Sequence, residues 1–348
     1  MGKERLPWID AAKGIGIFLV VYGHCMAPHN HYVYLFHMPL FFIISGYLFN
    51  SRNTWKQFFW RKFTTLYIPF IGWNAVVILT RLFGGLIRGD IETSTIVWHL
   101  RTLGYTFLTF AKDGDYMGAT WFLGALFLIS VLYKTLYAYL KDVKYKQEFI
   151  LLFFTVNAII VFFINLPRLQ SRTFILGMFF ALGHWVKLHE KELHAFNNVV
   201  IALWAAVIFT LIGHNISVSM SENEYSNRML FVIGACAGTY ITVFVSMCMS
   251  RFRGKFWEVF CKILCFLGKN SIDIVIWHFI AFRLCVLLQL YLDGKPMKEV
   301  FSCGPRYNTQ GGWWLLYLAV GIIVPLAWGW FLKQGPWGKV LKKIHFVA

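Results

Sequence analysis

Residues 8–24 read WIDAAKGIGIFLVVYGH, an apolar run with a lysine in its first half and a histidine at its end. About 20 apolar residues suffice for one helix to cross the hydrocarbon core of a bilayer. Runs of similar length follow along the whole chain. The predicted spans are 11–26, 33–49, 63–83, 118–140, 149–166, 173–186, 199–213, 229–249, 271–292 and 313–332. The sequence therefore predicts an all-α integral membrane protein with about ten transmembrane helices.

The composition excludes an ordinary soluble protein. Of the 348 residues, 58% are hydrophobic and only 14% are charged, whereas soluble domains carry about 25% charged residues. Ten crossings use about 200 residues, which leaves room only for short connections. We therefore expect a single membrane domain over residues 1–348, without a separate soluble domain.

The chain is strongly basic, with 33 Lys and Arg against 16 Asp and Glu. In a soluble protein this excess would suggest a nucleic-acid partner, but here the basic residues lie between the apolar runs. If both termini are inside, most of them fall in the inner loops, which is the usual bias of membrane proteins. We expect a multi-pass protein of the cell membrane with both termini cytoplasmic and no nucleic-acid partner.

The segment 86–117 is too apolar for a solvated loop and too polar to span. We expect a short interfacial or re-entrant helix here, between the third and fourth spans. A loop packed on the outer surface is the alternative.

Lys13 and His24 are the best candidate pair on the first span, because ionisable residues are costly inside a membrane. Eleven positions on a helix correspond to about 20° around the axis and about 16 Å along it. The two side chains therefore share one face at different depths, with Lys13 at the inner end and His24 near the outer end. The alternative is that Lys13 only anchors the topology and that His24 is an interfacial histidine.

His37 lies one to two turns below the outer surface on the second span, at a depth similar to His24. The two imidazoles are therefore expected to face one pocket. His29 and His31 lie in the loop between these spans, but no second set of strong ligands accompanies them. We expect no metal site.

The first span resembles that of the acyltransferase 3 family of membrane acyltransferases, in which Arg or Lys precedes an essential histidine at the spacing of Lys13 and His24. Further likenesses to the family are FHMPLFF at 36–42 with SGYL at 45–48, RKF at 61–63 with YIP at 67–69, WFL at 121–123, and GKNS at 268–271 leading to His278. Within this family, the chain most resembles the fucose 4-O-acetylase-like subgroup. The resemblance implies transfer of an acetyl group from cytosolic acetyl-CoA to a hydroxyl of a cell-surface or envelope carbohydrate.

A cytosolic acyl-CoA brings several phosphates to the inner face, where basic side chains can bind them. The candidate donor-binding residues are Lys13, Arg61, Lys62 and Lys269, with Ser271 from the last motif. For each basic residue the alternative is again a topological anchor.

For the chemistry, the resemblance makes His24 the essential residue, and an imidazole suits a general base because it accepts a proton near neutral pH. His37 would support the pocket. The hydroxyl of Ser45 or the amide of Asn74 would donate a hydrogen bond to the developing oxyanion. The alternative for each side chain is a hydrogen bond to a neighbouring helix. A relay through an acylated side chain is left open.

On the outer side, Trp121 is a candidate for stacking on a sugar ring, with a membrane-belt aromatic as the alternative. Asp115 is a candidate for binding acceptor hydroxyls, with a solvated loop as the alternative. A homodimer is also left open.

The alternative function is a secondary transporter or flippase for a sugar or a lipid-linked sugar. It would need a proton or ion site near the membrane midplane. On the ninth span only His278 and Asp273 qualify.

Overall fold

The computed structural model describes residues 6–88, 93–109, 116–164 and 168–347. These residues are mostly helical, and the strands among them form one short antiparallel pair, β1 (Val218–Ser219) with β2 (Glu224–Tyr225). The chain divides into two compact units, residues 1–53 with 132–271 and residues 54–131 with 272–348. The all-α prediction is confirmed, while the single domain over residues 1–348 stays a prediction.

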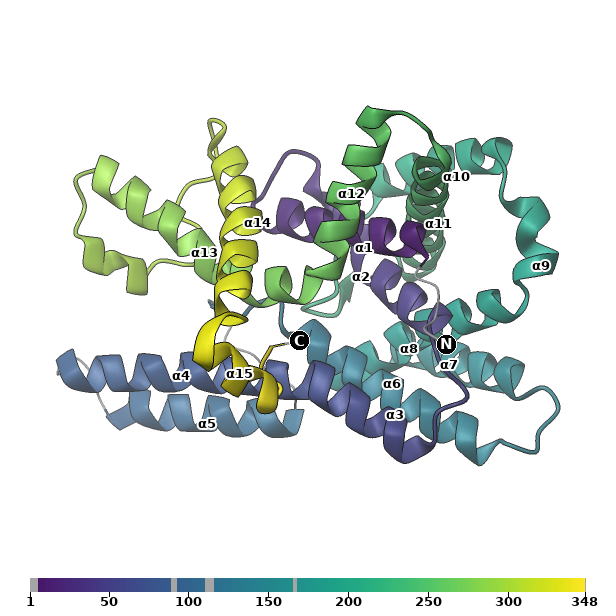
Figure 1. Cartoon of the computed structure of the whole chain (residues 1–348), viewed down its shortest axis with the longest axis horizontal. Coiled ribbons are helices and arrows are strands. Elements are labelled where there is room, and N and C mark those ends of the chain that lie inside the picture. Colours follow the sequence, from purple (N-terminus) through teal and green to yellow (C-terminus); the bar gives the residue numbers. More distant parts are fainter. Residues whose placement is uncertain (1–5, 89–92, 110–115, 165–167, 348) are drawn as a thin grey trace. The chain divides into compact units, whose positions relative to one another are not determined.

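The helices of the first unit come from both of its segments (Figure 1). They are α1 (Pro7–His24), α2 (Asn30–Tyr47), α7 (Lys146–Phe163), α8 (Arg168–Leu188), α9 (Glu190–Leu193), η2 (His194–Phe196), α10 (Val199–Asn215), α11 (Arg228–Arg251) and α12 (Lys255–Lys269). Helix α6 (Trp121–Tyr139) contributes residues to both units.

The second unit contains α3 (Trp55–Lys62), η1 (Phe63–Tyr67), α4 (Ile68–Arg88), α5 (Thr93–Thr109), α13 (Ser271–Leu292), η3 (Met297–Phe301), α14 (Trp313–Leu332) and α15 (Gly335–Lys343).

Each of the ten predicted spans corresponds to a helix in the part of the chain that the structure describes. Six helices are long and apolar enough to cross a membrane, or seven if α9 and η2 are counted with α10 as one bent span. Helices α1, α2 and α8 are not among them. In α1 the reason is compositional, because Asp10, Lys13 and His24 lower the hydropathy of an 18-residue helix. The chain is thus a multi-pass membrane protein, and a total of about ten spans stays a prediction.

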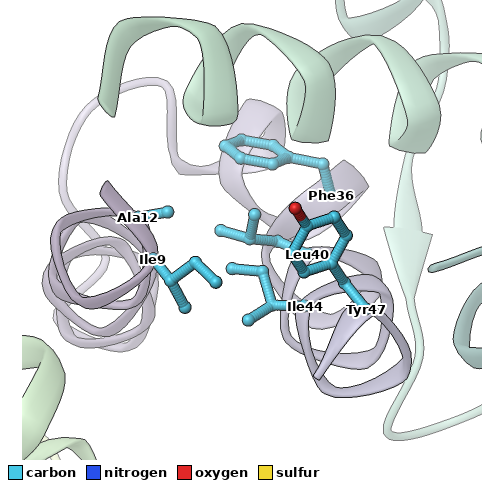
Figure 2. Close-up of a cluster of buried hydrophobic side chains, with 6 residues drawn as sticks. All are labelled: Ile9, Ala12, Phe36, Leu40, Ile44 and Tyr47. Atoms are coloured by element: carbon cyan, nitrogen blue, oxygen red, sulfur yellow. The ribbon is translucent and has the colours of Figure 1, made fainter. Parts of the chain in front are cut away.

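Helices α1 and α2 pack directly on each other through apolar side chains (Figure 2). Ile9 on α1 and Leu40 and Ile44 on α2 point into the space between the two helices. The buried cluster comprises Ile9, Ala12, Phe36, Leu40, Ile44 and Tyr47. This packing fixes the helix that carries Lys13 and His24 against the helix that carries His37.

Glycine lets the backbone of α1 touch that of α12. An added Cβ at Gly14 would overlap the carbonyl oxygen of Leu264, and one at Gly268 would overlap the carbonyl oxygen of Asp10. Each helix therefore supplies a glycine at the point where the other helix crosses it, as in close crossings between membrane helices. At Gly14 the neighbour of α1 is therefore α12.

Helices α2 and α8 cross in the same reciprocal way. An added Cβ at Gly46 would overlap the carbonyl oxygen of Phe180, and one at Gly183 would overlap that of Ile43. Both helices of the candidate site are thus held by backbone contact to a further helix of the same unit.

In the second unit, α5 occupies most of the segment 86–117 and lies beside α4 (Figure 1). The Arg81 guanidinium on α4 lies over the Trp98 ring on α5, 5.8 Å from its centroid. A helix in this segment is therefore confirmed, and its interfacial or re-entrant placement stays a prediction.

A widened π-helical turn, η1, separates α3 from α4. A proline clashes with the carbonyl four residues before it, and for Pro69 that residue is Thr65, which lies inside the turn. The π turn therefore accommodates Pro69 within an otherwise continuous helix. Arg61 and Lys62 immediately precede the turn, and both lie over the Phe58 ring.

Candidate active site

Helix α1 is continuous from Pro7 to His24 and ends at that histidine. Lys13 and His24 therefore do lie about 20° apart around the axis and about 16 Å apart along it. Both side chains are half-buried. Ile17 and Val20 lie between them on the same stripe and are buried, so the face that joins the two polar residues is apolar.

Tyr34 connects His24 to His37. Its ring meets the His24 ring edge-on with centroids 6.1 Å apart, and meets the His37 ring edge-on at 5.5 Å. The Tyr34 hydroxyl donates to the carbonyl oxygen of Gly23 at 3.0 Å. The structure therefore places Tyr34 in contact with both histidines, and a common site for the two imidazoles stays a prediction.

Tyr34 was not among the residues predicted from the sequence, although a signal was present. Tyr34 precedes His37 by three residues, a spacing that places two side chains on the same face of a helix. An aromatic residue at that position next to a candidate histidine was a reason to examine it.

His37 is held in one orientation. It is buried, with 5% of its surface exposed, and its Nδ1 lies 2.7 Å from the carbonyl oxygen of Val33. Because a carbonyl only accepts, Nδ1 must carry the proton in this hydrogen bond, and in the neutral ring Nε2 then has the lone pair. His37 is therefore able to accept a hydrogen bond or a proton at Nε2.

The loop between α1 and α2 is hydrogen-bonded to α1 and has an unusual backbone. Met26 and His29 adopt left-handed backbone conformations, with φ of 57° and 59°. The hydroxyl of Tyr22 donates to the carbonyl of Pro28 at 2.7 Å. Non-glycine residues adopt such conformations at a cost and often near functional sites, and these two residues border His24.

Ser45 lies apart from His37. The two residues are eight positions apart on α2, which corresponds to about 12 Å along the axis. The structure therefore does not bring Ser45 to the histidines. Asn74, the other candidate oxyanion donor, is buried and donates to the carbonyl of Phe70 at 2.8 Å and to Oγ1 of Thr120 at 3.0 Å. It links α4 to the segment that leads into α6.

The amino-terminal part of α1 meets α12, a helix that lies between the predicted spans and was not expected from the sequence. Lys13 adjoins Gly14 and Lys269 adjoins Gly268, the two glycines of the crossing. The structure thus brings these two candidate donor-binding lysines to the same crossing. The missed signal was the spacing of apolar residues in 255–269, which predicts an amphipathic helix.

Cys265 lies at this crossing, where its thiol donates to the carbonyl of Pro7 at 3.4 Å. Burial, with a contribution from the neighbouring Cys261, raises the pKa of the Cys265 thiol to about 11. Only the thiolate is a strong nucleophile. Cys265 is therefore poorly suited to carry an acyl group in a relay.

The remaining predicted site residues lie in several parts of the chain. Ser271 begins α13, shortly after Lys269 ends α12, so Lys269 lies close in sequence to the amino terminus of α13. Arg61 and Lys62 belong to the second unit, as does Trp121, which is 7% exposed and begins α6. Asp115 lies outside the described residues.

The residues proposed for a transporter are engaged in structural contacts. The carboxylate of Asp273 accepts a hydrogen bond from Lys333 Nζ at 2.8 Å, which links α13 to α14. His278 Nδ1 lies 2.7 Å from the carbonyl oxygen of Ile274. Among the described residues, no group of three or more His, Cys, Asp or Glu side chains is arranged to hold a metal ion.

A family model for an acyltransferase domain matches residues 6–334 of this many-helix membrane protein. The chain therefore belongs to the acyltransferase 3 family, and it is an acyltransferase. Nodulation protein NolL of Sinorhizobium fredii is 27% identical over 333 residues, which cover 84% of this chain and 83% of that protein. Nodulation protein NolL of Mesorhizobium japonicum is 27% identical over 143 residues, which cover 36% of this chain and 35% of that protein. No solved structure matches the chain.

Proposed function

We propose that this protein transfers an acetyl group from cytosolic acetyl-CoA to a hydroxyl of a cell-surface or envelope carbohydrate, with His24 as the general base. The observation that carries the proposal is the arrangement on α1, which presents Lys13 near the crossing with α12 and ends in His24 beside Tyr34 and His37. The protein would lie in the cell membrane with both termini in the cytoplasm.

In the proposed reaction, the His24 imidazole takes the proton of the acceptor hydroxyl as the oxygen attacks the thioester carbonyl. The carbon–sulfur bond then breaks, and the coenzyme A sulfur leaves with the proton that the imidazolium returns. Neither candidate oxyanion donor is free beside His37, because Ser45 lies about 12 Å from His37 along α2 and Asn74 is already bonded to Phe70 and Thr120.

Coenzyme A would bind by its phosphates to Lys13 and Lys269 at the α1–α12 crossing, with Ser271 close in sequence. Arg61 and Lys62 remain proposed donor contacts from the sequence. The pantetheine arm would not run along Gly14 and Gly16, since α12 fills the space beside the first and Leu40 and Phe41 fill the space beside the second. Trp121 and Asp115 remain proposed acceptor contacts, and a homodimer remains open.

The direct test of the donor is release of free coenzyme A thiol by purified protein in lipid nanodiscs. We expect release from acetyl-CoA that increases when an acceptor carbohydrate is added. A protein that is folded but neither binds acetyl-CoA nor releases thiol would contradict the proposal.

Lys13→Ala should weaken binding of acetyl-CoA about tenfold, since a hydrogen bond to a charged group contributes about 1.5–3 kcal/mol. Lys13→Arg should bind nearly as well, because the guanidinium keeps the charge and the donors. Lys255→Ala, at the far end of α12, is the matched control and should change little. The measurement is titration calorimetry of each variant. Unchanged affinity in Lys13→Ala together with lost activity would mean that Lys13 does not bind the donor.

Tyr34 is proposed to position His24. Tyr34→Leu should lower kcat about tenfold by removing the ring between the histidines, because misplacement of a reacting group by about 1 Å can cost up to 10²-fold. Tyr34→Phe keeps the ring and should retain most of the rate. Tyr32→Leu is the matched control, because the Tyr32 ring packs beside Gly213 on α10 instead. Equal losses of kcat in Tyr34→Leu and Tyr32→Leu, at unchanged donor KM, would show that Tyr34 does not position His24.

A further inference from the structure

A cavity of about 400 Å³ lies within the first unit, where α2 ends. Its volume is within the range of about 300–1,000 Å³ that is typical of small-molecule sites. The walls are mostly apolar and come from α1, α2, α8, the α9–η2 segment and α11. Trp8, Ile44, Val243 and Phe244 are among the side chains that form them.

The cavity lies where apolar spanning helices meet charged segments. Helix α10 exposes the apolar side chains of Leu203, Trp204 and Leu211, as expected of a helix that faces lipid. The α9–η2 segment before it has the sequence EKELHAF and turns away from α10 by 78°. This change of composition and direction is typical of the head-group level of a bilayer.

The floor of the cavity is held in place by hydrogen bonds. The hydroxyl of Tyr240 on α11 donates to the carbonyl of Phe196 at 2.7 Å. The side-chain nitrogen of Asn197 lies 3.3 Å from the sulfur of Met247. All four residues line the cavity or its rim, so its wall between η2 and α11 is a fixed part of the fold.

The charges at the rim leave one positive charge unmatched. Glu190 accepts hydrogen bonds from Tyr47 at 2.8 Å and from Lys187, so that the ammonium and the carboxylate compensate each other. Arg251 also lines the cavity, is exposed, and makes no ion pair with the described residues. An apolar cavity with one free guanidinium at its rim complements a ligand that has a hydrocarbon chain and one anionic group.

We propose that this cavity binds an anionic phospholipid, with an acyl chain between α2 and α11 and the phosphate on Arg251. With the proposed orientation of the chain, the lipid comes from the inner leaflet, where anionic lipids and basic juxtamembrane residues attract each other. The site differs from the donor site, because Trp8 and Lys13 point about 140° apart around α1. Coenzyme A, with its several phosphates, matches the lysines of the α1–α12 crossing better than a single arginine.

The bound lipid would connect α2, which carries His37, to the α9–η2 segment and α11. A ligand that binds only the folded state raises its stability by mass action. We therefore expect anionic phospholipid to raise the thermal stability of the full-length protein.

The experiment uses the delipidated full-length protein in neutral detergent, with phosphatidylglycerol or phosphatidylcholine added. Native mass spectrometry gives the affinity and a thermal melt gives the stabilisation. Phosphatidylglycerol should bind more tightly, and Arg251→Gln should weaken it about fivefold, the factor for one cation near an anionic lipid surface. Lys255→Gln removes an equivalent exposed charge that does not line the cavity, and should have a smaller effect.

Val243→Phe fills the cavity and should weaken both lipids equally. Arg251→Gln should weaken phosphatidylglycerol more than phosphatidylcholine, because the choline cation of the latter already offsets its phosphate. Because Arg251 is exposed, its variant tests the proposal even if Val243→Phe does not fold. Equal phosphatidylglycerol affinity in wild type and Arg251→Gln would overturn the proposal. Displacement of the lipid by acetyl-CoA would also overturn it, since the cavity would then belong to the donor.

Discussion

His24→Ala should lower acetyl transfer by about 10²- to 10⁴-fold, the usual contribution of a general base. The side chain ends α1 and is half-buried next to Tyr34, so its removal should leave the packing of α1 on α2 intact. Donor affinity should be nearly unchanged, because Lys13 lies about 16 Å away along the helix. The measurement is initial rate with acetyl-CoA and acceptor, together with a thermal melt and donor titration of the same preparation.

His37→Ala is the control for this prediction. If His37 only supports the pocket, its loss should be milder than that of His24. Its Nδ1–H is fixed on the Val33 carbonyl at 2.7 Å, which leaves Nε2 as a second candidate base. A well-folded His24→Ala protein that retains near wild-type activity, together with an inactive His37→Ala protein, would transfer the role of base to His37.

Gly14→Ala should strongly destabilise the protein and abolish activity through the fold. The added methyl group would overlap the Leu264 carbonyl oxygen, which belongs to backbone and cannot rotate away. Overpacking of a close contact costs about 1–3 kcal/mol and occasionally more, and we expect the upper end or beyond because two helix backbones must separate. The measurement is the midpoint of thermal unfolding and the yield of monodisperse protein.

Gly23→Ala, on the same helix, is the matched control. An added Cβ there would lie 3.5 Å from the Tyr34 and Val33 side chains, an ordinary contact distance. It should therefore unfold close to wild type. Similar unfolding midpoints for Gly14→Ala and Gly23→Ala would show that the backbones of α1 and α12 are not in contact at Gly14.

The hydrophobic pattern was sufficient to locate the long apolar helices, because apolar runs near the length of a membrane crossing are hard to mistake. The hydrophobic pattern did not identify which helices pack against each other. Gly14 lies where another segment approaches α1 closely, but that segment, α12, lies about 250 residues further along the chain. Its amphipathic pattern was obscured by the basic residues at its ends.

Only the part of the candidate site that lies on one helix was predictable from the sequence. Lys13 and His24 share one helix, so their relation follows from the helix repeat alone. The contact between His24 and Tyr34 depends on how the 25–29 loop returns the chain, with left-handed residues at Met26 and His29 that no propensity predicts. The contact between Tyr47 and Glu190 joins residues 143 positions apart, and only tertiary packing brings them together.

The most direct measurement of the central claim is transfer of isotopically labelled acetyl from acetyl-CoA to envelope carbohydrate. Inside-out membrane vesicles containing the wild-type protein would be supplied with labelled acetyl-CoA on their cytoplasmic face, and their glycans analysed by mass spectrometry. We expect labelled O-acetyl groups with wild-type protein, and a loss of about 10²-fold or more with His24→Ala. Unlabelled glycans in vesicles whose protein is folded and binds acetyl-CoA would contradict the account.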